Sequence, residues 1–277
     1  PGKKAKNRKG ILRSRGLIDE VNRLRADARV GPLGWSLDSS PDFLSVRRYE
    51  KSLAAAEKEL AKRIKKSKGG KYEPVVFPVM PKAIGETVLW SRTKKASDAV
   101  HGWLRQPVYR DSLLAPGRDL LSVPSDVGGY MLGFVYPAEQ AERGEPLVWP
   151  RHGQSNVDGS MPVIDLDERA RAAVLKAGIA EDAVVGMPIS IHFAREIDRK
   201  LLARVECRLF ERNRPLEGIL VYYDQPITDG GAVTKGMVVC VPTEPLKPGK
   251  VIEARWEAPL ELLGKDQQIA PSAFTVR

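Results

Sequence analysis

The feature that most constrains the fold is a change of hydrophobic pattern near Gly186. Before this point apolar side chains recur at helical spacing, as at Leu17, Val21 and Leu24. After it, residues 187–194 alternate apolar and polar side chains, which is typical of a half-buried strand. A length of 277 residues exceeds the roughly 150 residues of a typical domain. We therefore expect two parts with different secondary structure.

The later part contains six segments with the composition of strands, separated by turn signals such as DGG and PG. Their spacing is typical of an all-β sandwich. We predict an immunoglobulin-like β-sandwich domain over residues 180–277. The six expected strands are 187–194, 202–211, 218–223, 236–242, 250–257 and 272–276.

The earlier part is predicted to be mainly helical. One helix runs from about residue 17 to the Gly31-Pro32 stop, and a second begins with Ser40 as N-cap and Pro41 at its first position. The other elements expected before residue 180 are a helix over 97–105, a strand over 130–136, a loop over 137–160 and a helix over 165–177.

The net charge of +10 is carried entirely by the residues before Gly178, because the chain from Gly178 onward has 13 Lys and Arg against 14 Asp and Glu. Residues 1–14 form a basic arm, and the second helix carries a run of lysines. Such asymmetry favours an acidic partner, namely nucleic acid, an anionic membrane face or an acidic polysaccharide. A solvated basic face explains the same charge equally well.

Four segments of the first part carry motifs in a fixed order. The segment 21–36, VNRLRADARVGPLGWS, is followed by an I-G-E turn that ends at Glu86, and then by HGWLRQPVYRDSLLAP over 101–116. The segment 127–133, VGGYMLG, comes last. In this order they resemble the opening helix, the G-E-N turn, the second histidine block and the closing strand of the CAP superfamily, which comprises the cysteine-rich secretory and pathogenesis-related proteins. The resemblance implies an α-β-α sandwich over residues 15–137.

CAP proteins place two histidines and two acidic residues around a cleft that binds a divalent metal in several members. Carried onto this sequence, one acid is Glu86, the second acid is Gln106, the second histidine is Tyr109, and the first falls near Tyr49. Phenol and amide groups are poor zinc ligands. The resemblance therefore implies a degenerate ligand-binding cleft of these four residues, without metal or another cofactor and without an assigned catalytic residue. Arg110 follows the motif and is expected to fix the turn by donating to carbonyl groups.

The remaining reactive residues form no recognisable catalytic pattern. His101, His152 and His192 fall in a helix, a loop and the outward side of a strand, and are expected to be structural or exposed. Cys207 and Cys240 lack the spacing of a zinc site. They fit one disulfide across the sandwich or two buried thiols in neighbouring strands, and both interpretations stay open.

Together these patterns predict an α+β protein with a basic arm over 1–14, a CAP-like domain over 15–137, a linker and short helix over 138–179, and the β domain over 180–277. The chain begins at Pro1 without an initiator methionine or a signal peptide, so we expect a targeting segment to have been removed. We expect a secreted or cell-envelope binding protein of bacterial type that contacts an acidic envelope polymer or another envelope protein. It has no segment long and apolar enough to span a membrane and no nucleic-acid module signature. A metal-independent hydrolase of envelope polymers that uses Glu86, and a non-specific polyanion binder, are the alternatives.

Overall fold

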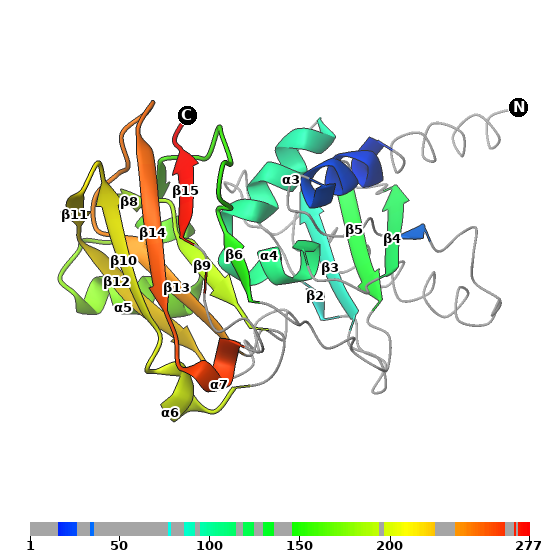
Figure 1. Cartoon of the computed structure of the whole chain (residues 1–277). Helices are drawn as coiled ribbons and strands as arrows, with labels where there is room; N and C mark the ends of the chain where they lie inside the picture. The colour runs from blue at the N-terminus through cyan, green and yellow to red at the C-terminus, as the bar shows by residue number, and fades with distance from the viewer. Residues whose placement is uncertain are drawn as a thin grey trace, which may run out of the picture. The chain divides into compact units, whose positions relative to one another are not determined.

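The chain forms an α+β protein whose described residues fall into two compact units. The computed structural model describes residues 16–26, 34–35, 77–78, 86–91, 95–114, 119–124, 130–135, 146–193, 197–224, 236–263, 269 and 271–277. The first unit contains the described residues up to 104 together with 112–135. The second contains residues 105–111 and the described residues from 146 onward. Figure 1 shows the elements along the chain.

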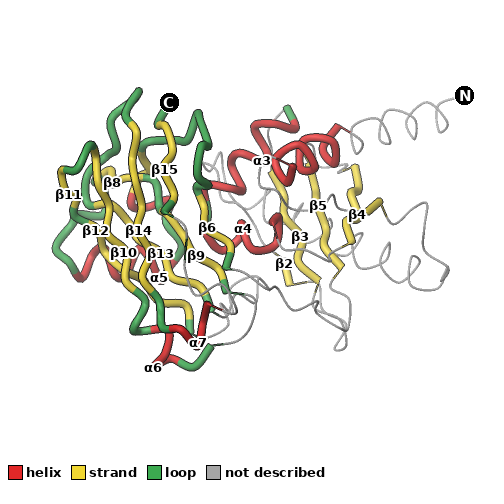
Figure 2. Tube along the Cα trace, viewed as in Figure 1, coloured by secondary structure: helices red, strands yellow, loops and turns green. Residues whose placement is uncertain are grey.

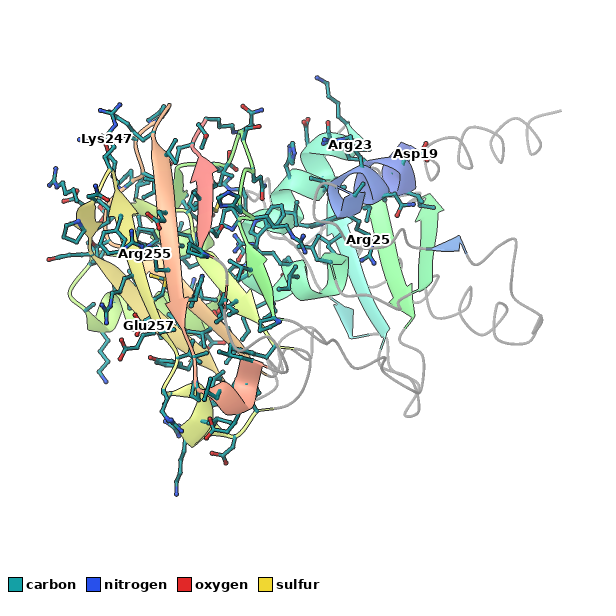
Figure 3. The ribbon with its side chains drawn as sticks, in the orientation of Figure 1. Asp19, Arg23, Arg25, Lys247, Arg255 and Glu257 are labelled. Carbon is teal, nitrogen blue, oxygen red and sulfur yellow. The ribbon has the colours of Figure 1, made fainter. Side chains whose placement is uncertain are left out.

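The first unit has two helical segments that bury apolar faces. The helix over residues 16–26 buries Leu17, Val21 and Leu24, which confirms the helical spacing seen in the sequence. Arg25 on the same helix (Figure 3) is only 1% exposed, and its Nη1 donates to the carbonyl oxygen of Leu113 at 2.8 Å. Such a bond is strong because the donor is charged and the environment is dry.

Helix α3 (Ala96–Arg105) confirms the helix predicted over 97–105, and it buries Val100 and Trp103. Helix α4 (Pro107–Leu114) follows after a single residue. Pro107 ends the first helix and begins the second, because proline lacks an N–H group but fits the first position of a helix.

A five-stranded sheet completes the first unit, with the order β1-β4-β5-β3-β2. Only β1 and β4 pair in parallel, and the other neighbours are antiparallel. Strand β5 confirms the strand predicted over 130–136. The second helix predicted from the sequence, and Tyr49 within it, lie outside the described residues. The strands are β1 (Gly34–Trp35), β2 (Phe77–Pro78), β3 (Glu86–Ser91), β4 (Asp119–Pro124) and β5 (Tyr130–Val135).

Two antiparallel four-stranded sheets dominate the second unit, with the orders β12-β13-β9-β6 and β11-β10-β14-β15. Figure 2 shows them as the yellow strands β6 and β9 to β15. The strands at 218–223, 236–242, 250–257 and 272–276 were predicted within about one residue. The bounds are β6 (Leu147–Trp149), β9 (Ile189–His192), β10 (Glu206–Glu211), β11 (Arg214–Leu216), β12 (Gly218–Tyr223), β13 (Met237–Pro242), β14 (Val251–Glu257) and β15 (Ser272–Thr275).

The two sheets pack face to face around an apolar core. Ile189, Ile191 and Val238 from the first sheet meet Ile252 and Phe274 from the second, and all are at most 1% exposed. Burial of this kind stabilises by about 25 cal/mol per Å² of apolar surface. The apolar residues that alternate with polar ones along β9 therefore form part of the core between the two sheets.

Residues 146–179 form more structure than the linker and short helix predicted over 138–179. They belong to the second unit and contain β6, β7 (Ser160–Pro162), a 3₁₀ turn over Val163–Asp165 and helix α5 (Glu168–Lys176). Strand β7 pairs with β8 (Val184–Gly186). The short strands were missed because three residues are too few to show an alternating pattern. Helix α5 confirms the helix predicted over 165–177, and Gly178 follows it with a φ of 88°.

Helix α5 packs against β12 and β13 and so covers part of the sheet face that points away from the inter-sheet core. Strand β13 is consequently buried at every position. Two short helices, α6 (Arg199–Leu202) and α7 (Leu260–Leu263), complete the unit. The second unit therefore contains helices beside its sheets, whereas the sequence predicted an all-β domain.

Candidate functional site

The four residues expected to line a CAP-like cleft are unequally described. Gln106 lies between α3 and α4 and Tyr109 lies in the first turn of α4, and both belong to the second unit. Glu86 is the first residue of β3 in the first unit, where it is described by its backbone, opposite Val135. Tyr49 lies outside the described residues. The structure thus describes two of the four side chains: Gln106 is hydrogen-bonded to Asp165, and Tyr109 lies within electrostatic reach of Asp167.

Gln106 connects the two helices and is 8% exposed. Its side-chain Nε2 donates to the carbonyl oxygen of Asp165, at the end of the 3₁₀ turn. The backbone carbonyl oxygen of Gln106 accepts from the backbone N–H of Tyr109 at 3.1 Å, which closes the first turn of α4. The side-chain Nε2 of Gln106 is therefore used in a hydrogen bond within the second unit.

Tyr109 is half-buried on the next turn and lies close to Asp167. Burial, and then the charge of Asp167, raise the pKa of the Tyr109 phenol well above its ordinary value. The phenol consequently stays neutral throughout the physiological range. A neutral phenol offers no anionic ligand to a cation.

Asp167 organises the neighbouring polar groups. Its Oδ1 accepts from the backbone N–H groups of Arg169 and Ala170 at 3.1 and 3.2 Å, which makes it the N-cap of α5. The hydroxyl of Tyr223, which is fully buried on β12, donates to Oδ2 at 2.7 Å. Burial raises the pKa of Asp167, while the bonds from Tyr223 and the backbone oppose that rise.

Arg110 supplies the deepest contact of the turn. Its side chain is fully buried, its Nη1 donates to Ser190 Oγ at 2.9 Å, and its Nη2 donates to the carbonyl oxygen of Arg105 at 3.3 Å. The second bond confirms the prediction that Arg110 fixes the turn through a carbonyl group. Burial lowers the pKa of Arg110 to about 9, so the guanidinium remains charged at neutral pH.

Ser190 and His192 share the face of β9 that Arg110 contacts. Ser190 Oγ lies 2.9 Å from His192 Nε2, a distance that suits a serine and its general base. The two residues are 0% and 1% exposed. A nucleophile must meet its substrate, so this pair serves to satisfy buried polar groups. His192 was expected on the outward side of the strand, as a structural or exposed residue; it lies on the side opposite Ile189 and Ile191 and is buried, which fits the structural alternative.

The first turn of α5 is held to the end of β12 by Arg169. Its Nη1 donates to the carbonyl oxygen of Tyr222 and to Asp224 Oδ1, both at 3.0 Å. Its guanidinium carbon lies 5.4 Å from the ring centroid of Tyr223, within the range of a cation–π contact. The polar cluster of Gln106, Tyr109, Arg110, Asp167, Arg169, Ser190, His192 and Tyr223 is hereafter called the turn cluster.

The sequence motif identified Gln106, Tyr109 and Arg110 of the turn cluster, but not the other residues of the cluster that surround them. Asp167 carries a signal that could have found it, since Asp directly before a helical segment is a favoured N-cap. Ser190 and Tyr223 carry none, because they lie 80 and 56 residues from Arg110 and Asp167 respectively. Only the pairing of β9, β13 and β12 places them together.

Metal and ligand sites were sought within the described ranges. No group of three or more His, Cys, Asp or Glu side chains there is arranged to hold a metal ion. An open depression of about 470 Å³ is lined by Ile164, Glu181 and Asp182. Among the described helices, none has the length and apolar character needed to cross a membrane.

Comparison with models of known protein families, with curated proteins and with solved structures finds no match to this chain. Inferences about function therefore depend on the residues of the chain itself. The turn cluster is the part of the described structure in which buried polar groups are most concentrated, and the hydrogen bonds given above join residues of the second unit.

Replacing Gln106 with glutamate, the acid expected at this position in CAP proteins, is predicted to destabilise the second unit by about 2 kcal/mol. The variant loses the donor to the Asp165 carbonyl oxygen and places a carboxylate against it. The measurement is urea denaturation followed by tryptophan fluorescence, with Gln106→Met as the control of similar volume. A glutamate variant as stable as the wild type would show that the amide is not held by this contact.

Proposed function

We propose that this protein is a secreted or cell-envelope binding and structural protein, in which a CAP-type domain with a degenerate, metal-free cleft is joined to an immunoglobulin-like β domain. The order of the CAP-like motifs over residues 15–137 supports the first half of the proposal. The five-stranded sheet with helices in the same unit is compatible with it.

The order of the strands supports the second half. Immunoglobulin domains arrange strands A to G in the sheets ABED and CFG. If β6, β9, β10, β12, β13, β14 and β15 are taken as A to G, the two sheets become ABED and CFG, with β11 added beside strand C. The segment between β6 and β9, which includes α5, is then an insertion between strands A and B.

One observation carries the functional proposal. Gln106, at the position of a CAP acid, donates to the Asp165 carbonyl oxygen, and Tyr109, at the position of a CAP histidine, is largely buried within electrostatic reach of Asp167. Arg110 beside them is fully buried against Ser190. Side chains held in this way stabilise the fold, and they are poorly placed to collect a metal ion or a substrate. The turn of the motif therefore acts as a structural part of the β unit.

The partner we propose is an acidic envelope polymer. The net positive charge of the chain lies in the residues before Gly178, so attraction would come from that part. Attraction between exposed charges is screened over about 8 Å at physiological salt. Binding of a fluorescent anionic polysaccharide should therefore weaken at least tenfold between low and high salt. Binding that persists at high salt would contradict a partner recognised by charge.

A zinc titration tests the cleft. We expect calorimetry to detect no stoichiometric Zn²⁺ binding to the wild-type protein or to the double variant Gln106→Glu, Tyr109→His, which restores two CAP side chains. The reason is that residue 106 lies against the Asp165 carbonyl oxygen and residue 109 is largely buried near the charge of Asp167, so we expect that restored ligands would not face a shared site. Stoichiometric binding by the double variant that is lost on adding Glu86→Gln would overturn the proposal, because it would demonstrate an intact cleft.

A further inference from the structure

The two cysteines meet between the sheets of the second unit. Cys207 lies on β10 and Cys240 on β13, which belong to different sheets. Cys240 is a member of the inter-sheet core at 1% exposure, and Cys207 packs against that core. Cys207 is on the same side of β10 as the buried core residue Leu209, and the interaction with Cys240 is the largest cause of its raised pKa, so the two thiols are neighbours in this core. The structure records both as free thiols.

The surroundings favour this particular pair. Gly218 lies beside Cys240, and a Cβ atom at Gly218 would come within 2.6 Å of Cys240 Sγ, so only glycine leaves room for the sulfur there. The contact and the burial raise the pKa of the Cys207 thiol above its ordinary value. A thiol of raised pKa and little exposure reacts slowly once the protein has folded. Chemistry between the two sulfurs is therefore expected during folding, before the sheets close.

We propose that Cys207 and Cys240 form a disulfide that joins the two sheets when the chain folds in an oxidising environment. In the strand correspondence given above this bond would connect strands C and E, whereas the disulfide of antibody domains connects B and F. The inference goes beyond the proposed binding function and does not depend on it. An oxidising compartment is needed only to supply the oxidant.

The oxidant is a low-molecular-weight disulfide, and the reaction is two successive thiol–disulfide exchanges. In the first, the Cys207 thiolate attacks one sulfur of the reagent, the reagent S–S bond breaks, and one reagent thiolate leaves. In the second, the Cys240 thiolate attacks the Cys207 sulfur of this mixed disulfide and releases the other reagent thiolate. The protein loses two electrons and two protons, and the reagent gains them as two thiols.

The test refolds the full chain from denaturant in a mixture of reduced and oxidised glutathione. Free thiols are then alkylated under denaturing conditions, and the product is analysed by intact mass and peptide mapping. We expect no alkylation, a mass lower by two hydrogen atoms, and a peptide in which Cys207 is linked to Cys240. Two alkylated thiols, or disulfides found only between two molecules, would overturn the proposal.

A comparison of thermal stability provides a second test of the disulfide. The melting temperature of oxidised wild-type protein should exceed that of the protein kept in reductant by about 8 °C, because the bond restricts the unfolded chain. The variant Cys207→Ala should show no such difference, since it cannot form the bond. Equal melting temperatures for oxidised and reduced wild type would count against a bond that fits the native structure, even if that variant fails to fold.

Discussion

Replacing Arg110 with alanine is expected to lower the free energy of unfolding of the second unit by about 4 kcal/mol. The fully buried side chain fills space between the turn and β9, and its guanidinium donates to Ser190 and to the Arg105 carbonyl oxygen. Alanine removes the packing and leaves both acceptors without that donor. Urea denaturation monitored by tryptophan fluorescence measures the loss.

Two further variants separate packing from charge. Arg110→Met keeps most of the side-chain volume and removes a charge that is costly to bury, so its loss should be about 1 kcal/mol. Arg208→Ala removes an arginine that is 61% exposed, and its effect should stay below about 0.5 kcal/mol. An Arg110→Ala variant as stable as Arg208→Ala would contradict a structural role for the turn.

Replacing Asp167 with alanine is expected to cost about 3 kcal/mol. The variant loses the N-cap of α5 and leaves the buried Tyr223 hydroxyl without its acceptor. Asparagine keeps a side-chain oxygen that can accept from the N–H groups of α5 and from the Tyr223 hydroxyl. Asp167→Asn should therefore change the stability by less than about 1 kcal/mol at neutral pH. Thermal or urea denaturation of the two variants side by side measures the difference.

The same pair of proteins gives a pH dependence whose sign is fixed. The folded-state pKa of Asp167 is raised above its ordinary value of 3.8, so the folded protein prefers the neutral carboxyl group. The stability that this preference contributes is present below pH 3.8 and is lost as the pH rises through the raised pKa. The stability of the wild type relative to Asp167→Asn should therefore fall as the pH rises from 3.8. A rise over that interval would mean that hydrogen bonds to the carboxylate outweigh burial.

The sequence predicted several elements well, and for a clear physical reason. Helix α3 and strand β14 were found because each is long enough to show its own hydrophobic period, and β12 and β13 because each is a continuous apolar run between turn signals. The prediction for β9 placed Ile189 and Ile191 correctly toward the core. The same alternation could not show that Ser190 and His192 are also buried, because Arg110, which donates to Ser190 on that side, comes from 80 residues earlier in the chain.

The candidate site was predictable only in part. The motif identified Gln106, Tyr109 and Arg110 as special, and the carbonyl contact of Arg110 was expected. The motif could not reveal that the turn belongs with the β unit, because that depends on tertiary contacts with Asp165, Asp167 and Ser190. The local sequence specifies the turn, whereas distant partners determine what its side chains do.

Native-state hydrogen exchange across the 105–111 turn tests the central claim most directly, because the claim is that this turn is part of the folded core of the second unit. The amides of residues 105–111 should open with the same free energy as those of β9 and β13. Arg110→Ala should lower the free energy of opening of both sets of amides by the same amount. Amides that exchange orders of magnitude faster than those of β9, with no response to Arg110→Ala, would contradict it. The turn would then be a mobile segment available to line a ligand cleft.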